Sequence, residues 1–438
     1  MGRCRESHHC IEVINMSRLH MFCRCWIAFM IFGAASTNHS LVLGNDTVGI
    51  SAVRQKLASK QPVKIVCLGD SVTGIYYHTG GRRAYPEMLE IALQQVVSQT
   101  NITVINAGIS GHSTVEALQR LQKDVLDHQP DLVTVMFGLN DMARVPKPDF
   151  QTNLEQIITH CRSAKAEVIL CTPNGVINTT GRPIAKLTEY NDVIKEVARQ
   201  QQVPICDCYA AYESIHKSDP LAWRLLLSDE IHPNMDGHKQ NAIELCRTIT
   251  GKTAKLQEIG PPQPMLPKTQ ARLKGNEPIR VLAMTPFDQL IGPAFKSLAP
   301  DAKLEVTPWP TADQTLQQLE QAAAKIRATQ PPYDLVLVAV PLAVTPPRSA
   351  PPEAAVLAYS WILNWSLSFG LQQWDVIGIT PTVLNANASP EERLSDDFAR
   401  QMISAQDLNL ITRKSSDLTT PQILEDWLRK SLARQSRM

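Results

Sequence analysis

The chain lacks an excess of charge of either sign. Its 43 lysines and arginines stand against 42 aspartates and glutamates, which leaves a formal net charge of +1. This balance produces no long-range field that would attract nucleic acid or an anionic membrane surface. The hydrophobic fraction of 44% suits an ordinary globular core, and 438 residues suggest two or three domains. We therefore expect a multidomain globular protein without a nucleic-acid partner.

The chain also lacks, near its N-terminus, an apolar run long enough to cross a bilayer comfortably. The run at 26–35 has about ten residues, whereas a spanning helix needs about twenty. Arg18 and Arg24 precede this run and small residues end it, a pattern typical of a secretory signal. We expect residues 1–36 to be a signal peptide, with Met16 as an alternative start, and the mature protein to be secreted or periplasmic without stable membrane insertion. The alternative is a short anchor that is never cleaved.

A clear set of metal-ligand residues is missing. Four of the ten cysteines fall in the leader, and six remain: Cys67, Cys161, Cys171, Cys206, Cys208 and Cys246. An exported chain can oxidise its cysteines, but four of these lie in apolar strand patterns, where cysteine behaves as a small buried hydrophobe. Cys206 and Cys208 form one close pair, which without a second pair is weak evidence for zinc. We expect no metal and no cofactor.

The Gly-x-Ser-x-Gly elbow of α/β-hydrolases is absent around the most suggestive serine. Instead, an apolar, β-branched run at 63–68 predicts a buried strand that ends in Gly69-Asp70-Ser71. Open α/β sheets bind ligands at the carboxyl ends of their strands, so Ser71 would lie where a nucleophile is useful. The competing interpretation is that Asp70 and Ser71 only cap a helix.

Strand and helix patterns alternate along the first half of the chain. The expected strands are 63–69, 103–106, 131–137, 168–173 and 203–207, and the expected helices are 85–97, 114–128, 154–164, 187–200 and 235–250. This alternation predicts an α/β fold with a parallel sheet covered on both faces. Right-handed crossovers then bring the strand-to-helix loops to one edge of the sheet.

Three further blocks follow Ser71 in order: 106–113 (NAGISGHS), 138–141 (GLND) and 229–233 (DEIHP). Together with Gly69-Asp70-Ser71, these blocks resemble the SGNH hydrolases, also called GDSL-type esterases, over residues 63–250. The resemblance implies a three-layer α/β/α, flavodoxin-like fold with a parallel sheet. It also implies a serine hydrolase that acts on ester bonds.

The residue types fit that chemistry. A serine hydroxyl needs a base to remove its proton, and His232 is the candidate base for Ser71. Asp229 can accept a hydrogen bond from the other ring nitrogen of His232 and hold the working tautomer. The resemblance completes the triad with these three residues. It assigns the oxyanion donors to the backbone N–H groups of Ser71 and Gly111 and to the side-chain amide of Asn140, while Gly108 is expected only to form a tight turn.

Three other histidines lie near these blocks. His78 belongs to a glycine-punctuated loop at 74–83 that either walls a pocket or is solvated. His112 follows Gly111 and is a candidate for the pocket lining. His238 lies on the last expected helix of this region, where we interpret it as structural or exposed.

The second half of the chain repeats the strand pattern after a proline-rich linker at 251–278. Strands are expected at 279–286, 333–340, 374–381 and 408–411. We expect residues 37–250 to form the catalytic domain and 279–438 to form a degenerate second copy of it, an unrelated α/β domain being the alternative. The second unit is expected to catalyse nothing, because Thr285-Pro286 stands where Ser71 would be and no histidine follows His238. Four tryptophans provide either a stacking surface for sugar or core packing: Trp309, Trp361, Trp365 and Trp374.

The combined interpretation is an exported serine esterase that forms an acyl-enzyme on carboxylic esters. Its expected substrate is a small-molecule or carbohydrate O-acyl ester. Two alternatives remain open: an acyltransferase that passes the acyl group to a sugar, and a catalytically silent carbohydrate-binding protein.

Overall fold

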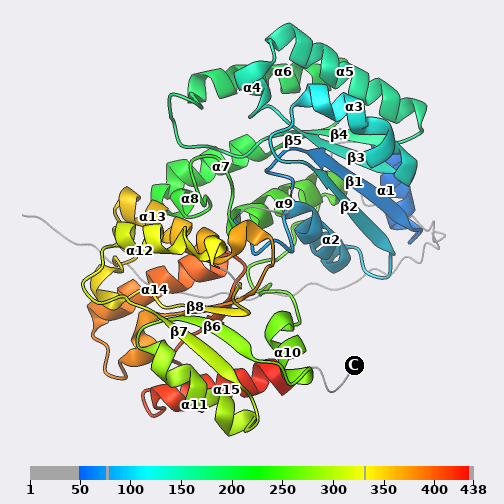
Figure 1. The fold of residues 1–438 in the computed structure, drawn as a ribbon. Helices are drawn as coiled ribbons and strands as arrows, with labels where there is room; N and C mark the ends of the chain where they lie inside the picture. The colour runs from blue at the N-terminus through cyan, green and yellow to red at the C-terminus, as the bar shows by residue number, and fades with distance from the viewer. Residues whose placement is uncertain (1–48, 75–77, 330–331, 434–438) are drawn as a thin grey trace, which may run out of the picture. The chain divides into compact units, whose positions relative to one another are not determined.

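The computed structural model describes residues 49–74, 78–329 and 332–433 (Figure 1). The expected signal peptide, residues 1–36, lies outside these ranges. None of the helices within them combines the length and apolar character needed to cross a bilayer.

The first sheet has five strands in the order β2-β1-β3-β4-β5. The strands are β1 (Val63–Gly69), β2 (Ile102–Gly108), β3 (Leu132–Met136), β4 (Glu167–Thr172) and β5 (Ile205–Asp207). All neighbours are parallel, with Ile65 paired to both Val104 and Leu132. The central strands β1 and β3 are mostly apolar and almost completely buried, because both faces of the sheet are covered. The expected parallel α/β architecture is confirmed.

Helices pack on both faces of this sheet (Figure 1). They are α1 (Ser51–Ala58), α2 (Tyr85–Val96), α3 (Thr114–Asp124), α4 (Asp141–Arg144), α5 (Lys147–Ser163), α6 (Ile184–Gln200), α7 (Cys208–Ser218), α8 (Pro220–Arg224) and α9 (Met235–Thr250). α2 contacts α9, whereas α3, α5 and α6 contact one another in series. The helix expected at 114–128 is shorter, since α3 ends at Asp124 and a 3-10 turn, Leu126–His128, follows. α7 and α8 were not expected.

The second sheet also has five parallel strands, in the order β7-β6-β8-β9-β10. The strands are β6 (Ile279–Met284), β7 (Leu304–Trp309), β8 (Leu335–Val338), β9 (Asp375–Ile379) and β10 (Asn409–Ile411). In chain order this is second-first-third-fourth-fifth, the same order as in the first sheet. β7 is a half-exposed edge strand that contains Glu305, Thr307 and Pro308, so it lacks the apolar run that revealed the other strands.

The helices of the second half are α10 (Pro267–Lys274), α11 (Phe287–Leu298), α12 (Leu316–Ala323), α13 (Glu353–Ser366), α14 (Pro390–Ala405) and α15 (Thr420–Ala433). α11 contacts α15, whereas α13 contacts both α12 and α14. The residues expected as a linker are partly structured, because α10 begins at Pro267 and Leu266 is fully buried.

Aromatic and sulfur side chains mostly fill the interior. Trp309 and Trp374 are buried, while Trp361 and Trp365 on α13 are half-buried. The six cysteines of the described chain are free and buried, so Cys67, Cys171 and Cys206 pack as small hydrophobes in strands as expected, whereas Cys208 begins α7. Burial raises the pKa of the Cys67 thiol to about 12, so this thiol is protonated and inert.

Candidate active site

The turn after β1 presents Ser71, which is half-buried. The Asp70 carboxylate accepts from Val72 N at 2.9 Å, and the Asp70 carbonyl accepts from Gly74 N at 2.9 Å. Burial raises the pKa of the Asp70 carboxyl to about 6. These bonds give Asp70 a bracing role that fixes the backbone on both sides of Ser71.

The second block supports the same turn from β2. Asn106 Nδ2 donates to the carbonyl of Thr73 at 2.8 Å. Gly108 has no room for a side chain, because a Cβ there would lie 2.3 Å from Gly74 N. The end of β2 therefore packs directly against the Ser71 turn, so Gly108 permits a close backbone approach at the end of a strand and does not form the tight turn that was expected.

Asp229 and His232 lie in a short loop before α9 that is closed at its base. Leu227 and Pro233 form an antiparallel bridge, and Ser228 N donates to the carbonyl of His232 at 2.9 Å. Inside the loop, the backbone N–H groups of Ile231 and His232 donate to Asp229 Oδ1 at 2.8 and 2.7 Å. The local backbone thereby orients the carboxylate of Asp229.

The loop brings Asp229, His232 and Ser71 into line. His232 Nδ1 lies 2.8 Å from Asp229 Oδ2, and His232 Nε2 lies 2.9 Å from Ser71 Oγ. Since the carboxylate only accepts hydrogen bonds, Nδ1 carries the proton and Nε2 is left as the acceptor for the serine hydroxyl. Ser71 and His232 are 161 residues apart in the chain, so only the fold brings them together.

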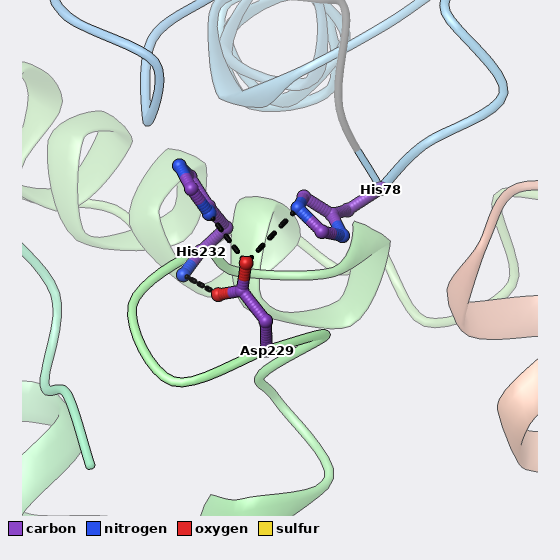
Figure 2. Close-up of side chains that lie close together, drawn as sticks. All are labelled: His78, Asp229 and His232. Carbon is purple, nitrogen blue, oxygen red and sulfur yellow. Dashed lines mark hydrogen bonds and ion pairs between the residues drawn. The ribbon is translucent and has the colours of Figure 1, made fainter. Parts of the chain in front are cut away.

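A third side chain, His78, contacts this group, as Figure 2 shows. Its Nε2 lies 3.3 Å from Asp229 Oδ2, and its ring stacks on that of His232 with centroids 4.9 Å apart. Burial would raise the pKa of Asp229, but the hydrogen bonds from His232 and His78 outweigh burial and hold the pKa well below its usual value. Burial lowers the pKa of His78 and keeps its ring neutral at neutral pH.

The sequence did not single out His78 for this position. It lies in the loop after Ser71, and only its place near the first block hinted at a role. His238, in contrast, is structural as expected: it is buried, and its Nδ1 accepts from Tyr85 N at 3.2 Å.

Two of the expected oxyanion donors, Gly111 and Asn140, lie on neighbouring loops, and the third is the backbone N–H of the Ser71 turn. Gly111 has a φ of +78°, which favours glycine, and its Cβ position faces open space. Asn140 directly precedes α4, and its Nδ2 donates to the carbonyl of His112 at 2.9 Å and lies 3.4 Å from Asp70 Oδ2. The Asp141 carboxylate accepts from Thr114 N at 2.9 Å and Gly138 N at 3.2 Å, which ties these loops together. Asn140 is thus linked to the Ser71 turn through Asp70 and to the Gly111 loop through His112.

The residues of this site also have a composition suited to a metal ion. His78, Asp229 and His232 each offer a ligand atom, all within 4.8 Å of one another, which sequence reasoning missed. However, the ring nitrogens facing Asp229 donate hydrogen bonds, and a cation there would require both nitrogens to lose their protons. The second nitrogen of His232 faces Ser71, which favours a hydrogen-bonded triad over a metal centre.

Residues 67–240 match the model of the GDSL-like lipase/acylhydrolase family. An acetylxylan esterase of Geobacillus stearothermophilus is 27% identical over 212 residues, which cover 42% of this chain and 93% of that protein. The uncharacterized lipoprotein YqeF of Bacillus subtilis (strain 168) is 31% identical over 170 residues, which cover 33% of this chain and 69% of that protein. An arylesterase of Vibrio mimicus is 28% identical over 177 residues, which cover 40% of this chain and 82% of that protein.

The chain therefore belongs to the GDSL-like lipase/acylhydrolase family. It is a carboxylic ester hydrolase of the GDSL/SGNH type. The matched region ends at residue 240 and so covers the first sheet but not the second.

Proposed function

We propose that this ester hydrolase uses Ser71 as its nucleophile, His232 as general base and acid, and Asp229 as the residue that orients His232. The observation that supports the proposal is the continuous chain of contacts from Asp229 Oδ2 through both ring nitrogens of His232 to Ser71 Oγ, with distances of 2.8 and 2.9 Å. Hydrogen-bond reach between nucleophile, base and orienting carboxylate is the geometry that such a triad requires.

In the first half of the reaction, Ser71 Oγ attacks the ester carbonyl carbon while His232 Nε2 takes the hydroxyl proton. The carbonyl oxygen becomes an oxyanion, which the N–H groups of Ser71 and Gly111 and the amide of Asn140 stabilise. The ester C–O bond then breaks, and His232 gives its proton to the leaving alcohol. The acyl group remains on Ser71 as an ester.

In the second half, a water molecule attacks the acyl-Ser71 carbonyl and His232 takes its proton. Collapse of the second tetrahedral intermediate breaks the bond to Ser71 Oγ, which recovers the proton from His232. The products are one carboxylic acid and one alcohol, and the enzyme returns to its starting state. Throughout, ionised Asp229 stabilises the imidazolium that forms at His232.

We propose a carbohydrate O-acyl ester, with acetyl as the first acyl group to test, as the substrate. One support is the similarity to a protein named acetylxylan esterase. A second is the position of two half-buried indoles on α13: Trp361 and Trp365 have ring centroids 5.9 Å apart, and the Trp361 ring lies 5.8 Å from that of His78. Indole faces offer a flat apolar surface on which a sugar ring can pack.

The test combines labelling with a substrate panel. A serine-directed fluorophosphonate should label the wild-type protein at Ser71, and acetylated oligosaccharides should be hydrolysed faster than long-chain lipid esters. Transfer of the acyl group to an added sugar in preference to water would make the protein an acyltransferase. A protein that binds the sugar but neither hydrolyses nor labels would be a binding protein, and the proposal would be wrong.

We further propose an exported protein in which a signal peptide at 1–36 precedes a catalytic domain at 37–250, a connecting segment at 251–278 and a non-catalytic second copy at 279–438. The shared strand order of the two sheets supports the duplication. Two observations support a non-catalytic second copy. Thr285 follows β6 as Ser71 follows β1, but its hydroxyl group bonds to Thr311 Oγ1 at 2.9 Å. No histidine follows His238 in the sequence. Mass spectrometry of the purified exported protein tests both the signal peptide and the non-catalytic second copy. The mature N-terminus should follow the signal peptide, and no fluorophosphonate label should be found after residue 278.

A further inference from the structure

The second half of the chain reaches the active site through one buried amide. Asn364 of α13 places its Nδ2 2.7 Å from His78 Nδ1, across 286 residues of sequence. Both side chains are almost completely buried, at 1% and 2% exposure. A buried polar group is costly unless it is hydrogen-bonded, so the other hydrogen-bond partners of Asn364 and His78 determine the role of this contact.

The partners of His78 determine which of its ring nitrogens carries the proton. Nε2 faces the Asp229 carboxylate, which only accepts hydrogen bonds, so Nε2 must donate. Nδ1 faces the Asn364 amide nitrogen, which only donates, so Nδ1 must accept. The Asp229 carboxylate and the amide of Asn364 thus together favour the neutral tautomer of His78 whose N–H points at Asp229.

Ser228, the residue before Asp229, strengthens this arrangement. Its Oγ lies 2.8 Å from His78 Nδ1, 3.1 Å from Asn364 Nδ2 and 2.9 Å from Gln406 Nε2. Gln406 follows α14, so two helices of the second half hold the hydroxyl group that borders Asp229. The Asp229 loop is therefore fixed from outside the first sheet as well as by its own backbone.

The loop that carries His78 is also attached to the second half. Arg83 makes a paired contact with the Asp407 carboxylate, Nη2 to Oδ1 at 2.6 Å and Nε to Oδ2 at 3.0 Å. Both side chains are largely buried, at 12% and 3% exposure. Two parallel charge-assisted hydrogen bonds restrict direction as well as distance, so they hold Arg83 to the turn that follows α14.

From these contacts we infer that the second half of the chain supplies a positioning residue to the active site: Asn364 orients His78, and His78 gives Asp229 a second side-chain hydrogen bond. The inference rests on the proposed triad and extends it, since the second half then has a role in turnover although it contains no nucleophile. The ring of His78 stacks on that of His232, so its orientation also limits how the catalytic base can tilt.

Asn364→Leu removes the donor while keeping the number and branching of the side-chain heavy atoms, and it should lower kcat by about 10- to 100-fold, the effect of losing a hydrogen bond to a charged group. KM should change little, because neither Asn364 nor His78 is assigned to substrate binding. Asn385→Leu is the matched control: Asn385 is a half-buried asparagine of the same half, bonded to Glu392 Oε2 at 3.2 Å and outside this network. All rates are divided by the concentration of sites that a fluorophosphonate titrates, so that loss of folded protein is not counted as loss of kcat.

Two variants of His78 separate positioning from packing. His78→Phe keeps a ring on His232 but has no N–H for Asp229, and kcat should fall as in Asn364→Leu. His78→Gln replaces Nε2–H with an amide N–H and should recover most of the loss. Equal kcat in the two variants would show that the ring only fills space and would overturn the inference.

Nitrogen NMR of ¹⁵N-histidine-labelled protein reads the tautomer directly. His78 should be neutral at neutral pH, because burial lowers its pKa, with its proton on Nε2, and Asn364→Leu should raise the share of the tautomer that is protonated on Nδ1. A doubly protonated ring, or a proton on Nδ1 alone, would overturn the inference. A normal kcat per titrated site in Asn364→Leu would also overturn the inference, provided that Ser71→Ala is inactive. An active Ser71→Ala protein would instead overturn the proposed triad itself.

Discussion

Asp229→Asn tests the triad with the smallest change in shape. The two backbone N–H groups at 2.7 and 2.8 Å hold an oxygen at the position of Oδ1, so the new amide nitrogen must occupy the position of Oδ2. There it faces His232 Nδ1, where wild-type protein has an N–H···O contact of 2.8 Å. Two donors cannot share this contact, so His232 must move its proton to Nε2.

That proton then points at Ser71 Oγ, and His232 can no longer accept the hydroxyl proton. A triad locked in the wrong tautomer loses about 10⁴-fold in kcat, or about 5.5 kcal/mol of transition-state stabilisation. The same change faces His78 Nε2 with a donor. Turning the amide over would restore both histidine contacts but would place its nitrogen against the two backbone N–H donors.

The assay is hydrolysis of a small chromogenic acetate ester, with thermal unfolding measured on the same samples. Asp207→Asn is the control. The Asp207 carboxylate caps α7, since its Oδ1 accepts from Ala210 N at 3.1 Å, and the side-chain oxygen of asparagine can accept the same hydrogen bond. The control should keep normal activity. An Asp229→Asn protein that is folded and loses less than about tenfold in kcat would refute the tautomer argument.

Four further outcomes are expected. Ser71→Ala should abolish hydrolysis and fluorophosphonate labelling with little change in melting temperature, because the half-buried hydroxyl contributes little packing; normal turnover in this variant would end the serine-hydrolase assignment. Asn140→Ala should lower kcat by about 100-fold with a much smaller effect on KM, since an oxyanion donor acts on charge that develops in the transition state; a raised KM at constant kcat would assign Asn140 to substrate positioning. Stability should fall as pH drops below 6.5, because burial lowers the pKa of His238 to about 3. Between these pH values the unfolded chain binds a proton that the folded chain does not, which lowers the free energy of unfolding by about 1.4 kcal/mol per pH unit. In His238→Asn the amide oxygen replaces Nδ1 as acceptor, so urea unfolding of this variant should lack this contribution. Chelation by EDTA should leave activity unchanged; activity lost in EDTA and restored by a divalent ion would instead assign a metal to His78, Asp229 and His232.

The fold could be predicted where burial requires a recognisable apolar pattern within a short stretch of sequence. β1, β3, β6 and β9 are buried along most of their length, so their sequences are apolar runs that only a covered strand explains. β7 has solvent on one side and a proline within it, and its sequence carries no comparable run. α7 and α8 both start from capping aspartates, Asp207 and Asp219, and such caps are too common to mark helices by themselves.

The proposed site likewise contains residues that the sequence predicted and residues that it did not. Ser71, Asn140, Asp229 and His232 lie in short blocks of characteristic composition, so the sequence alone named them and predicted the chemistry they would perform. The chain before and after each block also predicted strands and helices whose loops share one sheet edge. Local sequence therefore determined the identity of these residues and the class of fold that brings them together.

The tertiary structure alone decided what surrounds them. His78 and Asn364 belong to no motif, and they meet across 286 residues because the loop after β1 and the helix α13 pack at one point. Their role depends on burial and on which polar atoms face each other, and neither property is encoded in a short stretch of sequence. The sequence indicated the proposed reactive groups of this protein, whereas packing between its two halves decided how the carboxylate of Asp229 is held, because hydrogen-bond direction in a buried network is set by all of its members together.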